Sequence, residues 1–487
     1  PEQLTALSSF TYISNMKYDA IIIGAGHNGL VCAAYLAKSG KKVCVVERRS
    51  VLGGSAVTEE IFPGCKVSRA AYVNSLFRPE IIQDLKLKQY GLEFLSRRPA
   101  SFSPFPDQRY LILGNGLEKD QREIAKFSPK DANRYPEYET MLNSIVKYVE
   151  PLWKKPPPSP TSKKLSDLWE LASLGMKTRR SGNELIQKMV EMFTLSAGDL
   201  LDRWFESDEL KATLATDGVI GAMAGPYTPG TAYVLLHHVF GETNGMRGVW
   251  AYVRGGMGAL SDSIASACRD LGVEILLESG VDKISVNKRA TGIILSDSRE
   301  LSAKCVISSA DPHVTFLRLL DESVLPSDFR DKIDQMDFKS ATAKMNLHLS
   351  ELPDFIAFPG TNSGPQHSGT IHISPTMDFL EKAYDEAKYG RPSRHPMIEA
   401  TIPSTVDDTL APKGEHVMGI FCQYAPYKLK EGNWEDEKTL FANRIIDDFT
   451  EYAPNFRNSI IDYELLTPPD IETIFGLTGG NIFHGAM

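Results

Sequence analysis

The chain has 487 residues, of which 42% are hydrophobic and 24% are charged, a composition typical of a globular protein. Its formal net charge of −9 disfavours nucleic-acid binding, because a duplex-binding surface needs clustered Lys and Arg. No apolar run approaches the ~20 residues that a membrane-spanning helix requires. We therefore expect no nucleic-acid partner and no transmembrane segment.

The cysteines and histidines form no local metal or redox motif. No two cysteines are three residues apart, so there is no CxxC pair for zinc binding or disulfide exchange. The ten histidines include no HExxH. Local spacing therefore predicts no metal site, and the few cysteines favour a reducing compartment. The cysteines are Cys32, Cys44, Cys65, Cys268, Cys305 and Cys422.

A strand, a glycine turn, a helix and a second strand follow one another near the N-terminus. Residues 18–23 (YDAIII) predict a buried strand, residues 30–39 a helix, and residues 42–46 (KVCVV) a second buried strand. Together they fit one βαβ unit of about 30 residues.

The turn of this unit reads Gly24-x-Gly26-x-x-Gly29. Gly24 permits a tight turn, Gly26 lets the backbone approach a pyrophosphate, and Gly29 allows close packing of helix on sheet. Glu47 follows 18 residues after Gly29, where its carboxylate can accept hydrogen bonds from ribose hydroxyls. GxGxxG also occurs in ordinary glycine-rich turns, but the flanking elements and the acid predict a site for FAD or NAD.

Arg48 and the pair Gly53–Gly54 come next. The glycine pair can run the chain along a bound diphosphate, with Arg48 near the ribose or phosphate. The alternative is a solvated arginine followed by an ordinary turn. Dehydrogenases that bind NAD do not usually continue in this way.

The middle of the chain is predicted to be helical. Residues 120–150 and 165–215 have helical patterns, and the proline- and lysine-rich residues 150–164 between them indicate an exposed loop. Large apolar side chains cluster around this helical insert, where they form either ordinary core or an apolar pocket. They are Met223, Tyr227, Tyr233, Phe240 and Trp250.

The C-terminal half returns to strands. A helix is predicted from Gly255 to about Asp270, followed by strands over residues 273–277, 281–286, 292–295 and 305–308. Further strands are predicted over residues 343–349, 370–374, 397–402 and 416–424, and an amphipathic helix over 441–452. Asp311-Pro312 is interpreted as the end of a strand.

Three histidines are weak candidates for a catalytic base. His237 and His238 are consecutive on an apolar helix, so they point in different directions and at least one is expected to pack or cap. His484 follows Gly479–Gly480 and Phe483, which places it within reach of a flavin or substrate cavity. No other acid or base is singled out, so the catalytic residue stays unknown.

The segment 18–58 resembles the N-terminal FAD motif of the phytoene desaturase and amine oxidase flavoprotein superfamily. The motifs GAGHNGL, ERRSVLGGSAVTEE, LKATLATDGVIGAM, YVLLHHV, GGMGALSD, LTPPDIE and GGNIFHGAM extend the resemblance, to phytoene dehydrogenase-like members, over nearly the whole chain. The resemblance implies that Val281 holds the adenine edge through its backbone. It also implies that FAD is lined by Gly24, Gly26, Gly29, Glu47, Arg48, Gly53 and Gly54.

The predicted fold is α/β, a Rossmann-like FAD-binding domain with an inserted α+β substrate domain. The FAD-binding domain is assigned to residues 15–90 and 245–312, and the substrate domain to residues 91–244 and 313–487. The superfamily closes its flavin site with a C-terminal glycine-rich turn and helix. The chain ends at Met487 before such a motif, so this last part of the FAD domain is expected beyond it, and whether the shorter chain retains FAD is open.

We therefore expect an FAD-dependent oxidoreductase that transfers a hydride from a small, apolar substrate to flavin, as in a dehydrogenase or desaturase. The alternatives are an amine oxidase-like enzyme and a non-catalytic regulator that keeps the flavoprotein fold. A disulfide reductase is disfavoured, because the chain has neither a local dithiol nor a second GxGxxG unit.

Resemblance also implies a mitochondrial location, in the matrix, and a mitochondrial protein partner. Residues 1–17 contain a single basic residue, Lys17, and show no Arg-rich transit peptide.

Overall fold

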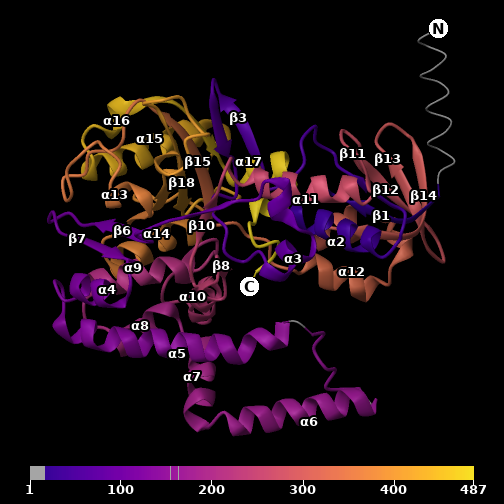
Figure 1. Cartoon of the computed structure of the whole chain (residues 1–487), viewed down its shortest axis with the longest axis horizontal. Coiled ribbons are helices and arrows are strands. Elements are labelled where there is room, and N and C mark those ends of the chain that lie inside the picture. Colours follow the sequence, from indigo (N-terminus) through magenta and orange to yellow (C-terminus); the bar gives the residue numbers. More distant parts are fainter. Residues whose placement is uncertain (1–16, 154, 163, 487) are drawn as a thin grey trace.

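Two large β-sheets lie towards the two ends of the long axis of the molecule (Figure 1). The computed structural model describes residues 17–153, 155–162 and 164–486. Residues 1–16, on which the expectation about a transit peptide depends, lie outside this range. Among the described residues, no helix combines the length and apolar character needed to cross a bilayer.

The first sheet, here called the N-terminal sheet, has six strands in the order β11-β2-β1-β14-β13-β12. β1 is parallel to β2 and β14, and β2 is parallel to β11, whereas β13 and β12 are antiparallel additions. The strands are β1 (Lys17–Ile23), β2 (Val43–Val46), β11 (Glu274–Leu276), β12 (Val281–Asn287), β13 (Arg289–Leu295) and β14 (Glu300–Ser308). The predicted parallel α/β unit is confirmed.

The parallel strands are buried because helices cover them. Ile21 and Ile22 point to opposite faces of β1 and both are fully buried. On the Ile22 side, α2 (His27–Lys38) and α11 (Gly258–Asp270) pack through small residues such as Ala33 and Ala34. Chain segments far apart in sequence thus form one layered unit.

The second sheet, here called the large sheet, has seven strands in the order β19-β15-β18-β17-β16-β6-β7. All neighbours pair antiparallel except β16 and β6. The strands are β6 (Ser101–Pro104), β7 (Tyr110–Leu113), β15 (Thr342–Leu349), β16 (Thr370–Ile373), β17 (Met397–Thr401), β18 (His416–Gln423) and β19 (Ile460–Leu466). The strands predicted from residue 343 onward are confirmed.

One face of the large sheet is apolar and packs against α15 (Trp434–Tyr452). Met345, Leu347 and Ile420 belong to this core together with Phe441 and Phe449 of α15. The helix begins seven residues before the predicted residue 441, since the side chain of Asn433 accepts a hydrogen bond from the backbone N–H of Asp436 and caps its N-terminus.

The opposite face of the large sheet is polar, although it is also buried. One row of neighbouring residues crosses four strands of this face: Lys344 in β15, Phe421 in β18, Glu399 in β17 and His372 in β16. Lys344 is 2% exposed, and its Nζ donates to Asn346 Oδ1 at 3.1 Å. Burial lowers the pKa of Lys344 to about 7. A polar face this deep in a protein needs partners, so we expect it to border a functional space.

Helices form a third region beneath the large sheet (Figure 1). These helices confirm the predicted helical insert. One of them, α6, carries exposed apolar side chains: Leu165 is 85% exposed and Trp169 is 71% exposed. These helices are α4 (Leu117–Ile124), α5 (Pro129–Trp153), α6 (Leu165–Arg180), α7 (Asn183–Thr194), α8 (Ala197–Trp204), α9 (Asp208–Val219) and α10 (Thr231–Val239). Other helices are α3 (Pro79–Asp84), α12 (Ser327–Asp334), α13 (Pro365–Ser368), α14 (Met377–Lys388), α16 (Phe456–Ser459) and α17 (Pro468–Phe475).

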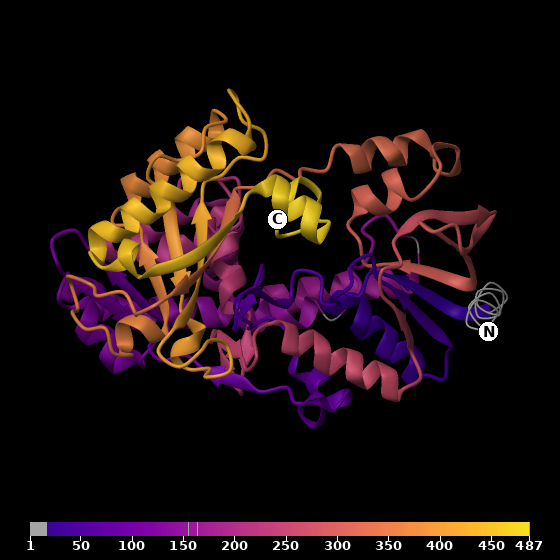
Figure 2. The ribbon, with the colours of Figure 1, turned by 90° about the horizontal axis from the view of Figure 1, so that it is seen from above.

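Short elements lie between the two large sheets. The hairpin of β3 (Thr58–Phe62) and β4 (Cys65–Ser68) was not predicted, and β5 (Phe94–Ser96) pairs with β10 (Ala251–Val253). A further small pair joins β8 (Glu242–Thr243) and β9 (Met246–Arg247). Seen from above, the C-terminal residues that include α17, in yellow, also lie between the two halves (Figure 2). The exact domain boundaries stay a prediction.

Replacing Lys344 by Met is expected to stabilise the protein in a pH-dependent manner. The pKa of Lys344 is lower in the folded chain than in the unfolded chain, so the folded state is destabilised by the charged, buried ammonium. This loss of folding free energy reaches its full size below the folded-state pKa of about 7. The destabilisation becomes smaller as the pH rises towards the pKa that Lys344 has in the unfolded chain, by ~1.4 kcal/mol per pH unit at most. Unfolding midpoints should therefore show the largest gain for Lys344→Met near ~pH 6 and a smaller gain near ~pH 9. The exposed Lys339→Met variant should show no such trend, and a pH-independent gain for Lys344→Met would contradict the prediction.

Candidate functional site

The turn after β1 forms a cradle whose glycines are required for different reasons. Gly24 has a φ of +94°, and a Cβ there would lie 2.6 Å from Ser309 Oγ. A Cβ on Gly29 would lie 2.2 Å from the carbonyl oxygen of Gly24, so α2 packs directly against the turn. A Cβ on Gly26 would meet no atom within 4 Å. The turn is therefore closely packed underneath and open above the N-terminus of α2, as an anion such as a diphosphate requires.

Gly53 and Gly54 lie against this turn, although they are distant in sequence. The N–H of Gly53 donates to the carbonyl of Ala25 at 2.9 Å, and a Cβ on Gly54 would lie 3.3 Å from the Cα of Gly26. Gly26 and Gly53 form a parallel bridge. The second glycine pair is thus packed directly against the glycine turn.

Glu47 lies at the carboxyl end of β2 and is 7% exposed. Its Oε2 accepts a hydrogen bond from the backbone N–H of Ala25 at 2.9 Å, and its Oε1 accepts one from Arg49 N–H at 3.0 Å. A carboxylate has about four acceptor positions, so two remain for ribose hydroxyls. The backbone of Ser279 donates to the Glu47 carbonyl at 2.7 Å, which brings the start of β12 at Val281 close to this acid.

The side chain of Arg48 contacts the end of a distant helix, α17, which the sequence did not suggest. Its Nη2 donates to the carbonyls of Thr473 at 3.0 Å and Ile474 at 2.7 Å, at the C-terminal end of α17. A cation at a helix C-terminus satisfies carbonyls that have no partner within the helix. The predicted contact of Arg48 with ribose or phosphate stays a prediction.

A cavity of about 750 Å³ extends from the N-terminus of α2 to the polar face of the large sheet. His27 and Asn28 of α2 border one end, and Glu399 and His372 of the large sheet border another part. Residues of α5, α9 and α10 also line the cavity, together with parts of several loops. Of the five aromatic and methionine residues singled out around the insert, only Trp250 lies among the lining residues in the described chain, while Phe240 is buried in the helical core.

The structure brings the three candidate histidines His237, His238 and His484 to this one cavity. The ring planes of His237 and His238 are nearly perpendicular, and their centroids lie 5.8 Å apart. His238 Nδ1 lies 3.0 Å from the carbonyl oxygen of Val234, so a proton on Nδ1 would donate to that oxygen. Burial lowers the pKa of His237 to about 4, and His238 adds to the effect, so His237 is neutral at pH 7.

His27 is a cavity residue that sequence reasoning missed, because it occupies a spacer position of the glycine motif. Burial lowers its pKa, and the nearby His484 lowers it further. Burial also lowers the pKa of His484, although the charge of Asp311 opposes this. The lowered pKa values favour neutral imidazoles at both positions, and both side chains border the cavity.

Polar residues of the cavity were also missed, since their positions in the sequence carry no motif. The Tyr72 hydroxyl donates to Glu399 Oε1 at 2.6 Å. Asp217 lines the cavity from α9. The buried Tyr138 hydroxyl has no hydrogen-bond partner among the described residues, and Tyr138 also lines the cavity. An unpartnered buried hydroxyl is costly, so it marks a position where a ligand gains a hydrogen bond.

Comparison with known proteins gives a consistent picture. Residues 29–353 match the family described as flavin containing amine oxidoreductase. The chain is 45% identical to the protein named pyridine nucleotide-disulfide oxidoreductase domain-containing protein 2 of Rattus norvegicus, over 97% of this chain and 85% of the rat protein. It is 28% identical to a limonene dehydrogenase subunit of Castellaniella defragrans, over 96% of this chain and 85% of the bacterial one.

Solved structures share the fold. An oxidoreductase from Methanosarcina mazei superposes with a TM-score of 0.56 at 18% identity, covering 93% of this chain and 88% of the other. At this level of identity the likeness supports the architecture of two large sheets and says nothing further about the reaction.

Replacing Gly26 by Ala is expected to leave the fold intact and to reduce flavin binding strongly. Its φ of −67° suits alanine, and the added methyl group projects into open space where a diphosphate would approach. The bound flavin per chain after purification, read from the visible spectrum, should fall while the unfolding midpoint of the flavin-free protein stays unchanged. Gly175→Ala, in α6 and equally free of neighbours, should retain full flavin, and normal flavin content in Gly26→Ala would refute the cradle.

Proposed function

The chain belongs to the flavin-containing amine oxidoreductase family, and on this premise we propose that it is an FAD-dependent oxidoreductase that takes a hydride from a carbon–carbon or carbon–heteroatom bond. The observation that carries the proposal is the continuity of the glycine cradle with the cavity. His27 and Asn28 begin the helix that the cradle precedes, and both line the cavity.

The arrangement of the cradle supports FAD rather than a flavin mononucleotide. FAD has a diphosphate and an adenosine, and both have matching groups here. Gly26 leaves room for a diphosphate, and Gly53–Gly54 pack directly against its turn. The two acceptor positions left on Glu47, with Val281 nearby, suit a ribose and an adenine edge.

When bound, the flavin would supply the hydride acceptor. The protein would contribute binding, orientation and exclusion of water. The neutral rings of His27 and His484 can hold or receive a proton at the end of the cavity next to the cradle. Tyr138 and Asp217 can hold a polar group of the substrate further inside.

The substrate we propose is a small molecule with an apolar body and one hydrogen-bonding group. Leu142, Leu235 and Phe421 supply apolar wall, and the likeness to a subunit of a limonene dehydrogenase is in keeping with an apolar body. Tyr138 and Asp217 would receive the polar group. An amine is one such group, because a carboxylate such as Asp217 attracts an ammonium in a site of low dielectric. Amine oxidation is therefore the second candidate reaction.

The purified protein should carry flavin, and a substrate should bleach its visible absorbance without oxygen. We would mix the flavin-loaded chain anaerobically with terpene hydrocarbons, lipophilic alcohols and lipophilic amines. Release of the cofactor by denaturation and chromatography would identify it as FAD. The Tyr138→Phe variant should keep full flavin and raise KM for substrates with a hydrogen-bonding group more than for hydrocarbons, since it lacks only the hydroxyl.

Two results would oppose this function. Absence of flavin after reconstitution would exclude a flavoenzyme. A flavin-loaded protein that no class of compound bleaches, but that dithionite reduces normally, would favour a non-catalytic flavoprotein.

We also propose a mitochondrial matrix location and a mitochondrial protein partner, which rest on the resemblance to phytoene dehydrogenase-like flavoproteins alone. A fluorescent protein fused to the C-terminus of the chain with its native N-terminus should colocalise with a matrix marker. A cytosolic distribution would overturn the assignment.

A further inference from the structure

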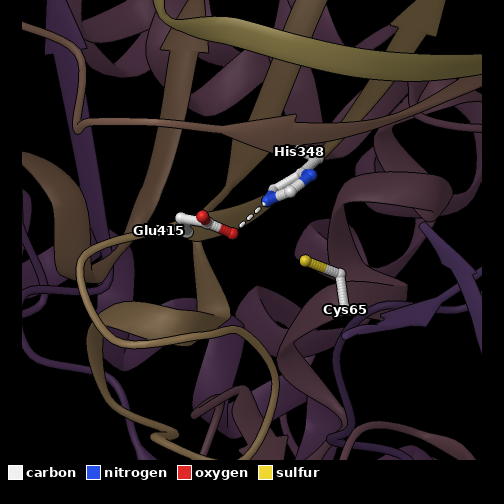
Figure 3. A group of neighbouring side chains, drawn as sticks. All are labelled: Cys65, His348 and Glu415. Atoms are coloured by element: carbon white, nitrogen blue, oxygen red, sulfur yellow. Dashed lines mark hydrogen bonds and ion pairs between the residues drawn. The ribbon is translucent and has the colours of Figure 1, made fainter. Parts of the chain in front are cut away.

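Three potential metal ligands from separate parts of the chain meet at one point outside the cavity. Cys65 begins β4, His348 lies in β15, and Glu415 immediately precedes β18. The ligand atoms of the three side chains all lie within 4.8 Å of one another. His348 Nε2 and Glu415 Oε2 are 2.7 Å apart, and the thiol of Cys65 points towards this pair (Figure 3).

The donor set favours one kind of cation. Thiolate sulfur and imidazole nitrogen are soft or borderline ligands, which Mg²⁺ and Ca²⁺ avoid and Zn²⁺ accepts together with a carboxylate. Zinc bonds of about 2.0–2.3 Å place tetrahedral ligands roughly 3.3–3.8 Å apart. Small side-chain movements therefore bring the three groups to zinc distances.

The burial of the cluster supports binding rather than a chance surface encounter. Cys65 is fully buried and His348 is 6% exposed, while the side chain of Glu415 is 37% exposed. The cation thus has an entry path beside Glu415 and space there for a water as fourth ligand. The ring of His348 stacks on Phe62, and Val67, Leu410 and Val417 form an apolar core next to the cluster.

We propose that Cys65, His348 and Glu415 bind one zinc ion, with a water molecule as the fourth ligand. Binding replaces the thiol proton of Cys65, which is released to solvent, and the Nε2 proton that His348 donates to Glu415 moves to Nδ1, so that Nε2 can bind the ion without any change of oxidation state. The three ligands are not among the residues that line the cavity, so the site is distinct from the proposed flavin site.

The position of the β3–β4 hairpin suggests what the ion does. At the base of the hairpin, Thr58 Oγ1 accepts from the N–H of Gly258 at 2.8 Å, and Ser68 Oγ accepts from Met257 N–H at 3.0 Å. These contacts attach the hairpin to the N-terminus of α11 beside the N-terminal sheet. At the tip, Cys65 would be joined through zinc to His348 of the large sheet. The ion would therefore connect the two halves of the molecule and stabilise their relative positions.

Zinc binding can be measured on the full flavin-loaded chain. The protein would be treated with a chelator, dialysed, given a small excess of zinc, and dialysed again before elemental analysis. We expect one zinc ion per chain and a rise in the unfolding midpoint when zinc is added. Cys65→Ala and the nearly isosteric Glu415→Gln should lose both the bound zinc and the rise.

Cys44→Ala is the matched control, because Cys44 is equally buried but lies in β2 of the N-terminal sheet. It should bind zinc as the unchanged chain does. The flavin spectrum reports whether each variant is folded. If the unchanged chain holds no more zinc than folded Glu415→Gln, or if zinc leaves its unfolding midpoint unchanged, the proposal is overturned.

Discussion

The contact between Gly29 and the carbonyl of Gly24 is the constraint on which the functional architecture depends. No side chain fits between them, because a Cβ on Gly29 would lie 2.2 Å from that oxygen. The contact seats α2 directly against the end of β1, with its N-terminal N–H groups exposed above the turn. It also places His27 and Asn28 at the edge of the cavity. The contact between Gly29 and the Gly24 carbonyl therefore positions both the glycine cradle and the part of the cavity wall nearest to it.

The large sheet imposes a second constraint, since it is buried on both faces. Its apolar face is satisfied by packing against α15, whereas its other face carries Lys344, Glu399 and His372 in one row. Such groups remain buried only at a cost in free energy unless they find partners. Glu399 accepts a hydrogen bond from Tyr72, and Lys344 donates one to Asn346. Burial also lowers the pKa of Lys344. The cost is understandable if this face shapes a polar part of the cavity.

Contacts across the space between the two sheets connect the two halves of the molecule. Arg48, next to the cradle, binds carbonyls at the end of α17. The β3–β4 hairpin is attached to α11 at its base and reaches the large sheet at its tip. Cys65 and His348 come together at that tip (Figure 3). The relative position of the halves matters, because the cavity has walls from both.

The sequence alone determined the βαβ unit, the glycine motif and its acid, the later strands and the helical insert. These signals are local: a turn needs glycine where φ is positive, as at Gly24, and a buried strand needs an apolar run. Only the tertiary structure decided that His27 belongs to the cavity, that Arg48 caps α17, and that Cys65 lies beside His348 and Glu415. These relations join residues that are up to several hundred positions apart, as Arg48 and Thr473 are. Local spacing and periodicity carry no information about such distances, because they depend on how the whole chain packs.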